Sequence, residues 1–142
     1  MDFDQLFSTF RISASGLAAE QQRMRVIANN LANANVTKAA DGAPFRKDVV
    51  LFREVLDREA RSGEGLAGVR VEGLIKSTEP FRSEYQPGHP DADKTTGMVQ
   101  LPNVDPVTEM VDMITASRAY QANLAVLTTY KEMMLQTLRL SR

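Results

Sequence analysis

The sequence lacks several residue types that many protein functions require. It contains no cysteine and no tryptophan, and only one histidine among its 142 residues. Without cysteine there are no disulfides, no thiol nucleophiles and no cysteine-based metal sites. Aromatic residues make up only 6% of the chain, so a compact core would have few large side chains to pack around. A disulfide-stabilised module and a cysteine enzyme are therefore excluded.

Charge of one sign and long apolar runs are also missing. The chain has 17 basic and 18 acidic residues, a net charge of -1, and its basic residues are scattered, which argues against nucleic-acid binding. No apolar run approaches the roughly 18 residues of a membrane span, so direct membrane insertion is not expected. The first residues carry Asp2 and Asp4, where a secretory signal needs a basic region. We therefore expect no cleavable signal.

Motifs that carry catalysis or bind cofactors are absent as well. There is no GxSxG, no glycine-rich phosphate loop and no HExxH. The single histidine, His89, lies near Asp91 and Asp93, a spacing that allows a metal site or an acid/base pair. The alternative is a Pro-Gly turn with solvated acids, which we favour because no third or fourth ligand is nearby. The sequence thus predicts no enzyme activity, no cofactor and no metal site.

What the sequence does contain is a long apolar repeat at its start. Apolar residues recur in alternating steps of four and three, the heptad spacing that keeps one stripe facing a partner helix. The pattern predicts a helix within residues 1–35. Its seam consists of Phe3, Phe7, Phe10, Ala14, Leu17, Gln21, Met24, Ala28 and Leu31.

A second helix is predicted from Asp105 to Leu140. Asp105 can cap it, Pro106 fits its first turn, and Glu109 follows closely. Its methionines could form an adaptable binding surface, although such a stripe is more often ordinary core. The apolar arc comprises Met110, Met113, Ile114, Tyr120, Leu124, Leu127, Met134, Leu135 and Leu138.

The middle of the chain has a different pattern. Residues 36–103 hold all the glycine except Gly16 and all the proline except Pro106, and the apolar spacing there shortens toward two. A short helix is the alternative for residues 53–61. The predicted strands are residues 46–52, 69–75, 81–85 and 98–101.

These patterns predict a single, mainly α domain with a small β insert. The two long terminal helices, within residues 1–35 and 104–142, would pack as an antiparallel coiled-coil pair. The central strand and loop region, residues 36–103, would project from one tip of that pair. Such a pair alone is marginally stable, so we expect the chain ends to gain order on association with other chains.

The stretch ANNLANAN, residues 28–35, is unusual for the end of an apolar helix because asparagine is a poor helix former. Asn33 or Asn35 could simply end the helix. Asn29 and Asn33 lie one turn apart on one face beside Ala28 and Ala32. A strip of alanine and amides permits close helix approach, and a buried amide fixes register. We therefore interpret the asparagines as alignment devices.

Two blocks of the chain resemble a known family. The segment SGLAAEQQRMRVIANNLANANVT, residues 15–37, resembles the amino-terminal signature of the axial proteins of the bacterial flagellum, the rod and hook subunits. A second block, from Gly88 to Met134, is similar to the proximal rod members of that family. The resemblance implies a structural subunit that polymerises with itself and with other rod proteins into a torque-transmitting shaft.

The resemblance also implies a location and an export route. Such subunits lie in the flagellar basal body, in the rod that crosses the periplasm, and are exported through the flagellar type III apparatus without signal cleavage. Their terminal helices, here residues 1–35 and 104–142, form a discontinuous axial core of coiled coils. We predict subunit interfaces at Phe7, Phe10, Leu17, Met24, Asn29, Asn30, Leu31, Asn33, Met110, Met113, Ile114, Tyr120, Leu124, Leu127 and Met134.

Three other readings remain at this point. The chain could be a helical partner-binding module of regulatory or chaperone-like type, which holds a partner helix in a groove. It could be a different rod or hook subunit, since those proteins share the first signature. It could also be an enzyme that uses His89 and Asp91.

Overall fold

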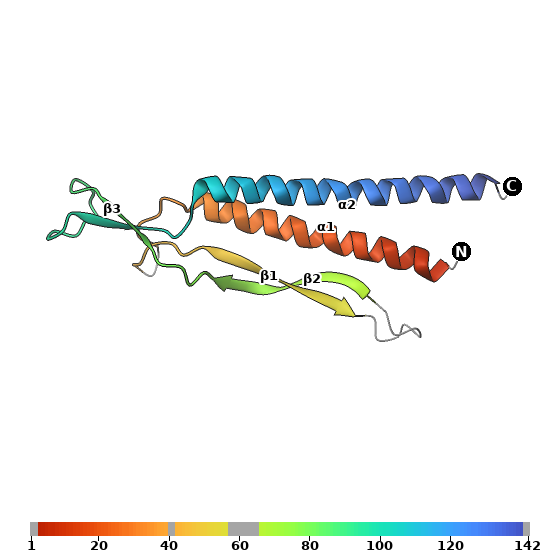
Figure 1. The fold of residues 1–142 in the computed structure, drawn as a ribbon, viewed down its shortest axis with the longest axis horizontal. Helices are drawn as coiled ribbons and strands as arrows, with labels where there is room; N and C mark the ends of the chain where they lie inside the picture. Colours follow the sequence, from red (N-terminus) through yellow and green to blue (C-terminus); the bar gives the residue numbers. More distant parts are fainter. Residues whose placement is uncertain (1–2, 40–41, 57–65, 141–142) are drawn as a thin grey trace. The chain divides into compact units, whose positions relative to one another are not determined.

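The computed structural model describes residues 3–39, 42–56 and 66–140. It confirms a mainly helical chain with a small β insert. Two long helices enclose four strands in the sequence, and the strands form two separate two-stranded sheets (Figure 1). The element order is α1 (Phe3–Ala32), β1 (Asp48–Leu56), β2 (Leu66–Lys76), β3 (Arg82–Tyr85), β4 (Met98–Leu101) and α2 (Pro106–Leu140).

The four predicted strands are confirmed. The alternative of a short helix for residues 53–61 is wrong for residues 53–56, because β1 continues to Leu56. Strand β1 pairs with β2, and this pairing in a sheet overrides the helix preference of the local sequence. Arg53 also forms an ion pair of 3.0 Å with Glu72 on β2. Residues 57–61 lie outside the described residues.

Local side chains satisfy the backbone groups at one end of each helix. At the end of α1, the Asn33 amide donates to the Asn29 carbonyl oxygen at 2.8 Å. At the start of α2, the Asp105 carboxylate accepts bonds from the Val107 backbone N–H at 3.2 Å and from the Thr108 hydroxyl at 2.6 Å. The free N–H groups of a first helical turn need such an acceptor. Asp105 is therefore the cap that the sequence predicted.

Replacing Asp105 with alanine should destabilise the fold in a pH-dependent way. The hydrogen bonds from Thr108 and Val107 hold the pKa of Asp105 below its ordinary value. A lowered folded pKa adds stability above the unfolded pKa, and that stability is lost as the pH falls through the folded pKa. In thermal unfolding at pH 7, Asp105→Ala should have a lower Tm than the wild type. The difference in Tm between the two proteins should become smaller below about pH 4. A Tm difference that is the same at low pH would contradict this.

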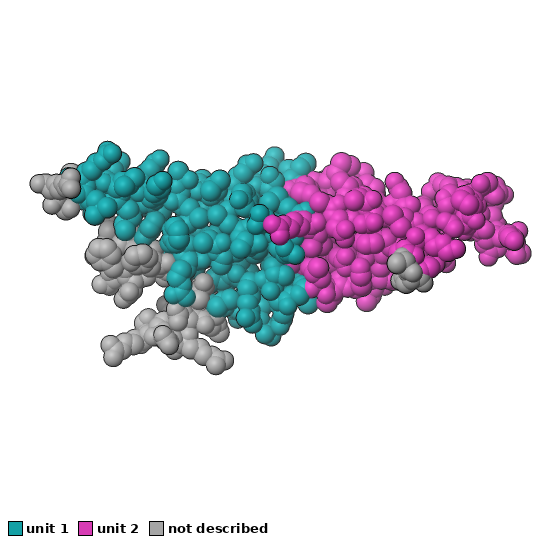
Figure 2. Space-filling model, turned by 180° about the vertical axis from the view of Figure 1, so that it is seen from behind, with its two compact units in different colours: residues 1–24, 51–73, 114–142 teal, residues 25–50, 74–113 magenta. Residues whose placement is uncertain are grey.

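The described chain forms two compact units, coloured separately in Figure 2. The first comprises residues 1–24, 51–73 and 114–142, and the second comprises residues 25–50 and 74–113. Both helices and the β1–β2 hairpin contribute segments to each unit.

In the first unit, α1 contacts α2 on one side. The rings of Phe10 and Tyr130 lie with centroids 6.2 Å apart. Six residues further along α1, Gly16 faces Asn123. The two residues are so close that a Cβ on Gly16 would be 3.0 Å from the Asn123 amide nitrogen. Residue numbers rise along α1 as they fall along α2 at these contacts. The two helices are therefore antiparallel here, as the sequence predicted.

The other side of α1 in this unit contacts β2. The Val69 backbone N–H donates to the Ser15 hydroxyl at 3.0 Å, and the same hydroxyl donates to the Ile12 carbonyl at 2.7 Å. The strand thus lies along the helix, with α1 between β2 and α2 (Figure 1). The expectation that the whole insert projects from one tip of the helix pair is wrong for this hairpin, because a serine on α1 supplies a polar attachment point for the strand.

Gly68 makes this approach of β2 to α1 possible. Its φ is +121°, a conformation that favours glycine, and an added Cβ would lie only 2.1 Å from the Ser15 hydroxyl oxygen. Gly68→Ala should lower the free energy of unfolding by about 1–3 kcal/mol through backbone strain. Urea denaturation should show this loss. Gly73→Ala is the control, since a Cβ there meets nothing within 4 Å, and an equal loss in both variants would contradict the explanation.

The second unit holds most of the buried side chains that the structure describes. Strands β3 and β4 pair antiparallel, with Arg82 opposite Leu101 and Tyr85 opposite Met98. At the open end of the β1–β2 hairpin, the Ser77 backbone N–H donates to the Lys47 carbonyl at 2.8 Å. Around these strands lies a small apolar core consisting of Val26, Ile27, Ala34, Val99, Pro102 and Val104. Small aliphatic side chains form this core, as the low aromatic content implies.

Candidate assembly interface

A buried asparagine joins three elements in the second unit. Asn30 on α1 is 1% exposed. Its amide nitrogen donates to the Asp48 carbonyl at 2.9 Å, and its amide oxygen accepts from the Asp48 backbone N–H at 2.9 Å. The same nitrogen donates to the Glu109 carboxylate on α2 at 3.2 Å. An amide offers a donor and an acceptor side by side, and at this position the amide of Asn30 uses both.

Four further residues complete what we call the buried polar network. Glu109 is 1% exposed, and its charge is balanced by an ion pair with Lys47, whose Nζ lies 2.5 Å from Oε1. The Lys47 backbone N–H donates to the Asn103 amide oxygen at 2.8 Å. A buried carboxylate without such a partner would be strongly destabilising. The network consists of Asn30, Lys47, Asp48, Asn103 and Glu109.

The network sets alignment within one chain. It holds the start of β1 against the end of α1 and the start of α2, and this alignment gives the Asn30 amide its hydrogen-bond partners and the Glu109 carboxylate its ion pair. The sequence suggested alignment by Asn29 and Asn33, but those two side chains bond to each other at 3.2 Å at the end of α1. Lys47, Asp48, Asn103 and Glu109 were not predicted for this role, because no local pattern marks residues that meet only in the folded chain.

The cluster around His89 is occupied by local bonds. The His89 Nδ1 accepts from the Asp91 backbone N–H at 3.1 Å, and the Asp91 carboxylate accepts from the Thr37 hydroxyl at 2.8 Å. The Lys38 Nζ also lies 3.9 Å from the Asp91 carboxylate. These contacts attach the loop before β4 to the segment after α1. His89 and Asp91, which were considered for a metal site or an acid/base pair, thus hold this loop in place.

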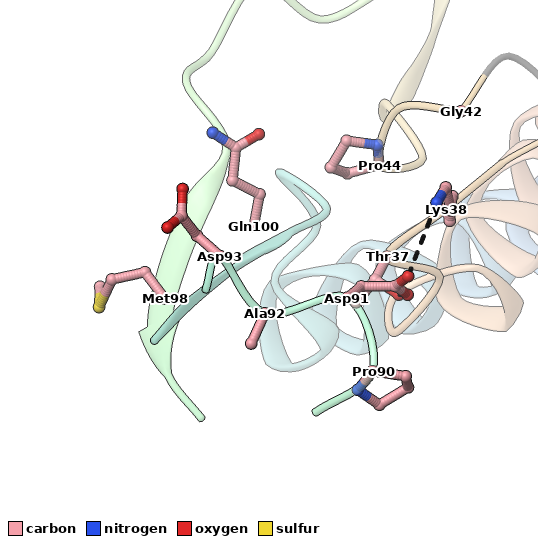
Figure 3. A pocket seen from close by; sticks show the side chains of 10 residues that line it. All are labelled: Thr37, Lys38, Gly42, Pro44, Pro90, Asp91, Ala92, Asp93, Met98 and Gln100. Carbon is pink, nitrogen blue, oxygen red and sulfur yellow. Dashed lines mark hydrogen bonds and ion pairs between the residues drawn. The ribbon is translucent and has the colours of Figure 1, made fainter. Parts of the chain in front are cut away.

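Asp93 borders a cavity beside this loop. The cavity has a volume of about 420 Å³, and Figure 3 shows the side chains that line it. Backbone N–H groups of Thr95 and Thr96 donate to one oxygen of Asp93 and keep its pKa below the ordinary value. Within residues 3–39, 42–56 and 66–140, no group of three or more histidines and acids is placed to hold a metal ion.

The predicted interface residues are mostly accessible in the single chain. Asn30 alone among them is fully buried, and nothing is described for the Phe7 side chain. The α1 residues with the lowest exposure, such as Ala19, Val26 and Ile27, lie off the predicted seam. Leu17, Met24, Leu31, Asn33, Met113, Tyr120, Leu127 and Met134 are half-buried, whereas Phe10, Asn29, Met110, Ile114 and Leu124 are exposed.

Helix α2 exposes more apolar surface than the sequence analysis predicted. Val107 is 65% exposed and Val111 is 58% exposed. They join Met110 and Ile114 at positions i, i+3, i+4 and i+7, which is one face of a helix. This spacing is present in the sequence, but Val107 and Val111 lie outside the predicted apolar arc. Across the described part of the chain, neither helix is long and apolar enough to span a membrane.

Comparisons with known proteins agree with the family resemblance of the two blocks, residues 15–37 and 88–134. Residues 10–39 match the family model described as flagella basal body rod protein, and residues 95–140 match that described as flagellar basal body rod FlgEFG protein C-terminal. The chain is 45% identical to the flagellar basal-body rod protein FlgC of Salmonella typhimurium over 137 residues, 96% of this chain and 98% of that protein. It is 43% identical to FlgC of Aquifex aeolicus, over 93% and 94% of the two chains, and 40% identical to FlgC of Borreliella burgdorferi, over 90% and 92%.

Proposed function

Because the chain belongs to the FlgC family of flagellar basal-body rod proteins and is a structural subunit of the bacterial flagellar rod, we propose that it polymerises with copies of itself and with other rod proteins into the torque-transmitting shaft of the proximal rod. The rod crosses the periplasm in this proposal. The helices within residues 1–35 and 104–142 form its axial core, and residues 36–103 form the outer part.

The observation that carries this proposal is the exposed apolar surface of α2. In the first unit, Leu127 and Met134 are half-buried and lie seven residues apart, along one line on the surface of the helix. Exposed apolar side chains flank that line on both sides, with Leu124 and Leu135 on one side and Val126 and Met133 on the other. A helix that is apolar on more than one side is suited to contact several neighbours. We assign these flanks to coiled-coil contacts with adjacent subunits.

A shaft requires contacts that do not close into a ring. Each subunit must then offer two different complementary surfaces, so that every added copy presents a new free surface. At a rise of about 1.5 Å per residue, the 35 residues of α2 extend for roughly 52 Å. A net charge of -1 keeps long-range repulsion between stacked copies small. Torque is then carried by side-chain packing alone.

The route to the rod is part of the proposal. Membership of the rod family supports export through the flagellar type III apparatus. The predicted interface residues of both terminal helices then meet other rod subunits during assembly. In this proposal the predicted seam of α1, including Leu17, Met24 and Leu31, contacts helices of neighbouring subunits.

Electron cryomicroscopy of basal bodies tests the proposed function. Basal bodies from cells that lack this protein should have no continuous rod, and expression of the wild-type chain should restore it. A complete rod without the protein would contradict the proposal. Mixing the purified chain with other rod proteins distinguishes the proposed function from the alternative of a partner-binding module. Ordered rods support a shaft subunit, whereas a saturating one-to-one complex supports a partner-binding module.

A further inference from the structure

Strand β3 has one free edge. Within residues 3–39, 42–56 and 66–140 it pairs with β4 alone, and all four of its residues are exposed. Just after β3, the Gln86 backbone N–H donates to the Gly97 carbonyl on the β4 side. Residues two apart in an antiparallel strand point their backbone groups to the same side, so those of residues 82 and 84 also point toward β4. The N–H and carbonyl of Ser83 and of Tyr85 therefore point to the free edge.

The sequence along this edge is complementary to its own reverse. Residues 81–85 read FRSEY, which is an aromatic residue, a base, a serine, an acid and an aromatic residue. Read backward, the order is the same with the two charges exchanged. Side chains alternate between the faces of a strand, so Arg82 and Glu84 share one face and the other three side chains share the opposite face. Such a segment matches an antiparallel copy of itself.

The two charges of β3 are available to a partner. In the part of the chain that the structure describes, the side chains of Arg82 and Glu84 form no ion pair and no hydrogen bond. Asp105 lies in the same unit, but the bond from Thr108 is the main cause of its lowered pKa and the Arg82 charge is the last cause. Both Asp105 oxygens already accept bonds from the first turn of α2. Neither charge of β3 is thus neutralised at close range.

We infer that β3 pairs with β3 of a second copy of this chain, antiparallel and centred on Ser83. Each Ser83 then donates its N–H to the Ser83 carbonyl of the other copy, because these groups point to the free edge. Arg82 of each copy lies opposite Glu84 of the other, in the type of pair that brings side chains closest. Tyr85 lies opposite Phe81 on the other face. The two hairpins form one four-stranded sheet.

The charges select both the register and the partner. Moving the centre by one residue places Arg82 opposite Arg82 or Glu84 opposite Glu84, and it also aligns backbone groups that point toward β4. Like charges directly opposite each other are destabilising. Moving the centre by two residues removes both ion pairs. A strand of a second copy carries the base and the acid at the two positions that this register requires.

This pairing is distinct from the contacts of the shaft. It is closed by a twofold axis, so two copies use up both free edges and no third copy can add. The inference goes beyond the proposed function and does not rest on it, because it concerns the free chain and a strand outside the terminal helices. A contact built on one short strand is small, so we expect a reversible dimer in equilibrium with single chains.

Charge exchange tests the pairing by sedimentation velocity of the purified chain over a range of concentrations. The wild type should form a species of twice the 15.7 kDa mass. Arg82→Glu alone and Glu84→Arg alone should each weaken dimerisation at least about tenfold, because both cross-strand pairs become repulsive. An equimolar mixture of the two variants should dimerise about as tightly as the wild type, since each supplies the opposite charges to the other. The chain with both substitutions should do the same.

The matched control is Lys94→Glu. Lys94 is exposed in the loop before β4, and its substitution changes the net charge by the same amount as Arg82→Glu, so dimerisation should be unchanged. An equal loss with Lys94→Glu would show that net charge, and not the register of β3, controls association, and would overturn the inference.

Ser83→Pro tests the backbone part of the contact. Proline is tolerated in an edge strand where the N–H points away from the sheet, so the bonds between β3 and β4 remain. The two central hydrogen bonds of the dimer are lost, and dimerisation should weaken at least about tenfold. Thermal unfolding should show that the single chain keeps its fold.

Two results would overturn the inference. One is a wild-type chain that stays single at every concentration up to its solubility limit. The other is a dimer that the single charge reversals and Ser83→Pro leave unchanged. Rod assembly in cells is a separate measurement, so failure of this inference leaves the proposed function standing.

Discussion

Replacing Asn30 with leucine is expected to lower the free energy of unfolding of the purified chain by about 2–4 kcal/mol, through the loss of hydrogen-bond partners for buried groups. Leucine has the same number and branching of side-chain heavy atoms as asparagine but offers neither donor nor acceptor. The Asp48 backbone N–H and carbonyl and one Glu109 oxygen would each lose the partner that Asn30 provides. Urea denaturation at neutral pH measures the loss.

The matched control is Asn35→Leu. Asn35 lies just after α1 and is exposed, so the same substitution there should change the unfolding free energy by no more than about 0.5 kcal/mol. An equal loss at the two positions would show that asparagine content, and not the buried polar network, determines the stability. A loss confined to Asn30 would confirm that the network holds the fold together.

Placing a charge on the exposed flank of α2 is expected to abolish rod assembly. Leu124 is 47% exposed in the single chain, and the proposed function places it in contact with another subunit. Leu124→Asp would bury an unpaired carboxylate in that contact, at a cost of several kcal/mol for each subunit. Cells that carry this variant should be non-motile in soft agar and should lack complete rods in electron micrographs.

Two measurements separate this assembly defect from misfolding. The purified Leu124→Asp chain should unfold within about 0.5 kcal/mol of the wild type, as is usual for an exposed position. Ala125→Asp adds the same charge at an exposed position of α2 that lies outside both flanks and should leave swimming intact. Swimming cells with Leu124→Asp would rule out this flank as an interface.

The helices and strands were predictable because their signals are local. The heptad spacing of α1, the Asp105-Pro106 start of α2 and the alternation within β2 each lie within a few neighbouring residues. The end of β1 was less certain because Arg53 and the residues after it favour a helix in isolation. The pairing of β1 with β2 decides the outcome, and a contact between separate strands has no local signature.

The candidate site was only partly predictable for the same reason. Asn30 was among the predicted residues, but its partners Asp48 and Glu109 are 18 and 79 positions away. The attachment of β2 to α1 depends on the Ser15 hydroxyl and on the absence of a side chain at Gly68. Neither residue type indicates such a contact by itself. Exposed faces, by contrast, follow from helix periodicity, and Val107 and Val111 could have been found that way.

The way in which the buried amides hold the chain affects how its sequence can evolve. Asn30 binds the main-chain N–H and carbonyl of residue 48, and Asn103 binds the main chain of residues 47 and 79. Every amino acid except proline presents the same N–H and carbonyl at residues 47 and 48. As far as these hydrogen bonds are concerned, residues 47 and 48 can therefore be substituted over generations without loss of the bonds. Asn30 and Asn103 cannot, because their side chains supply the amides that bind this main chain.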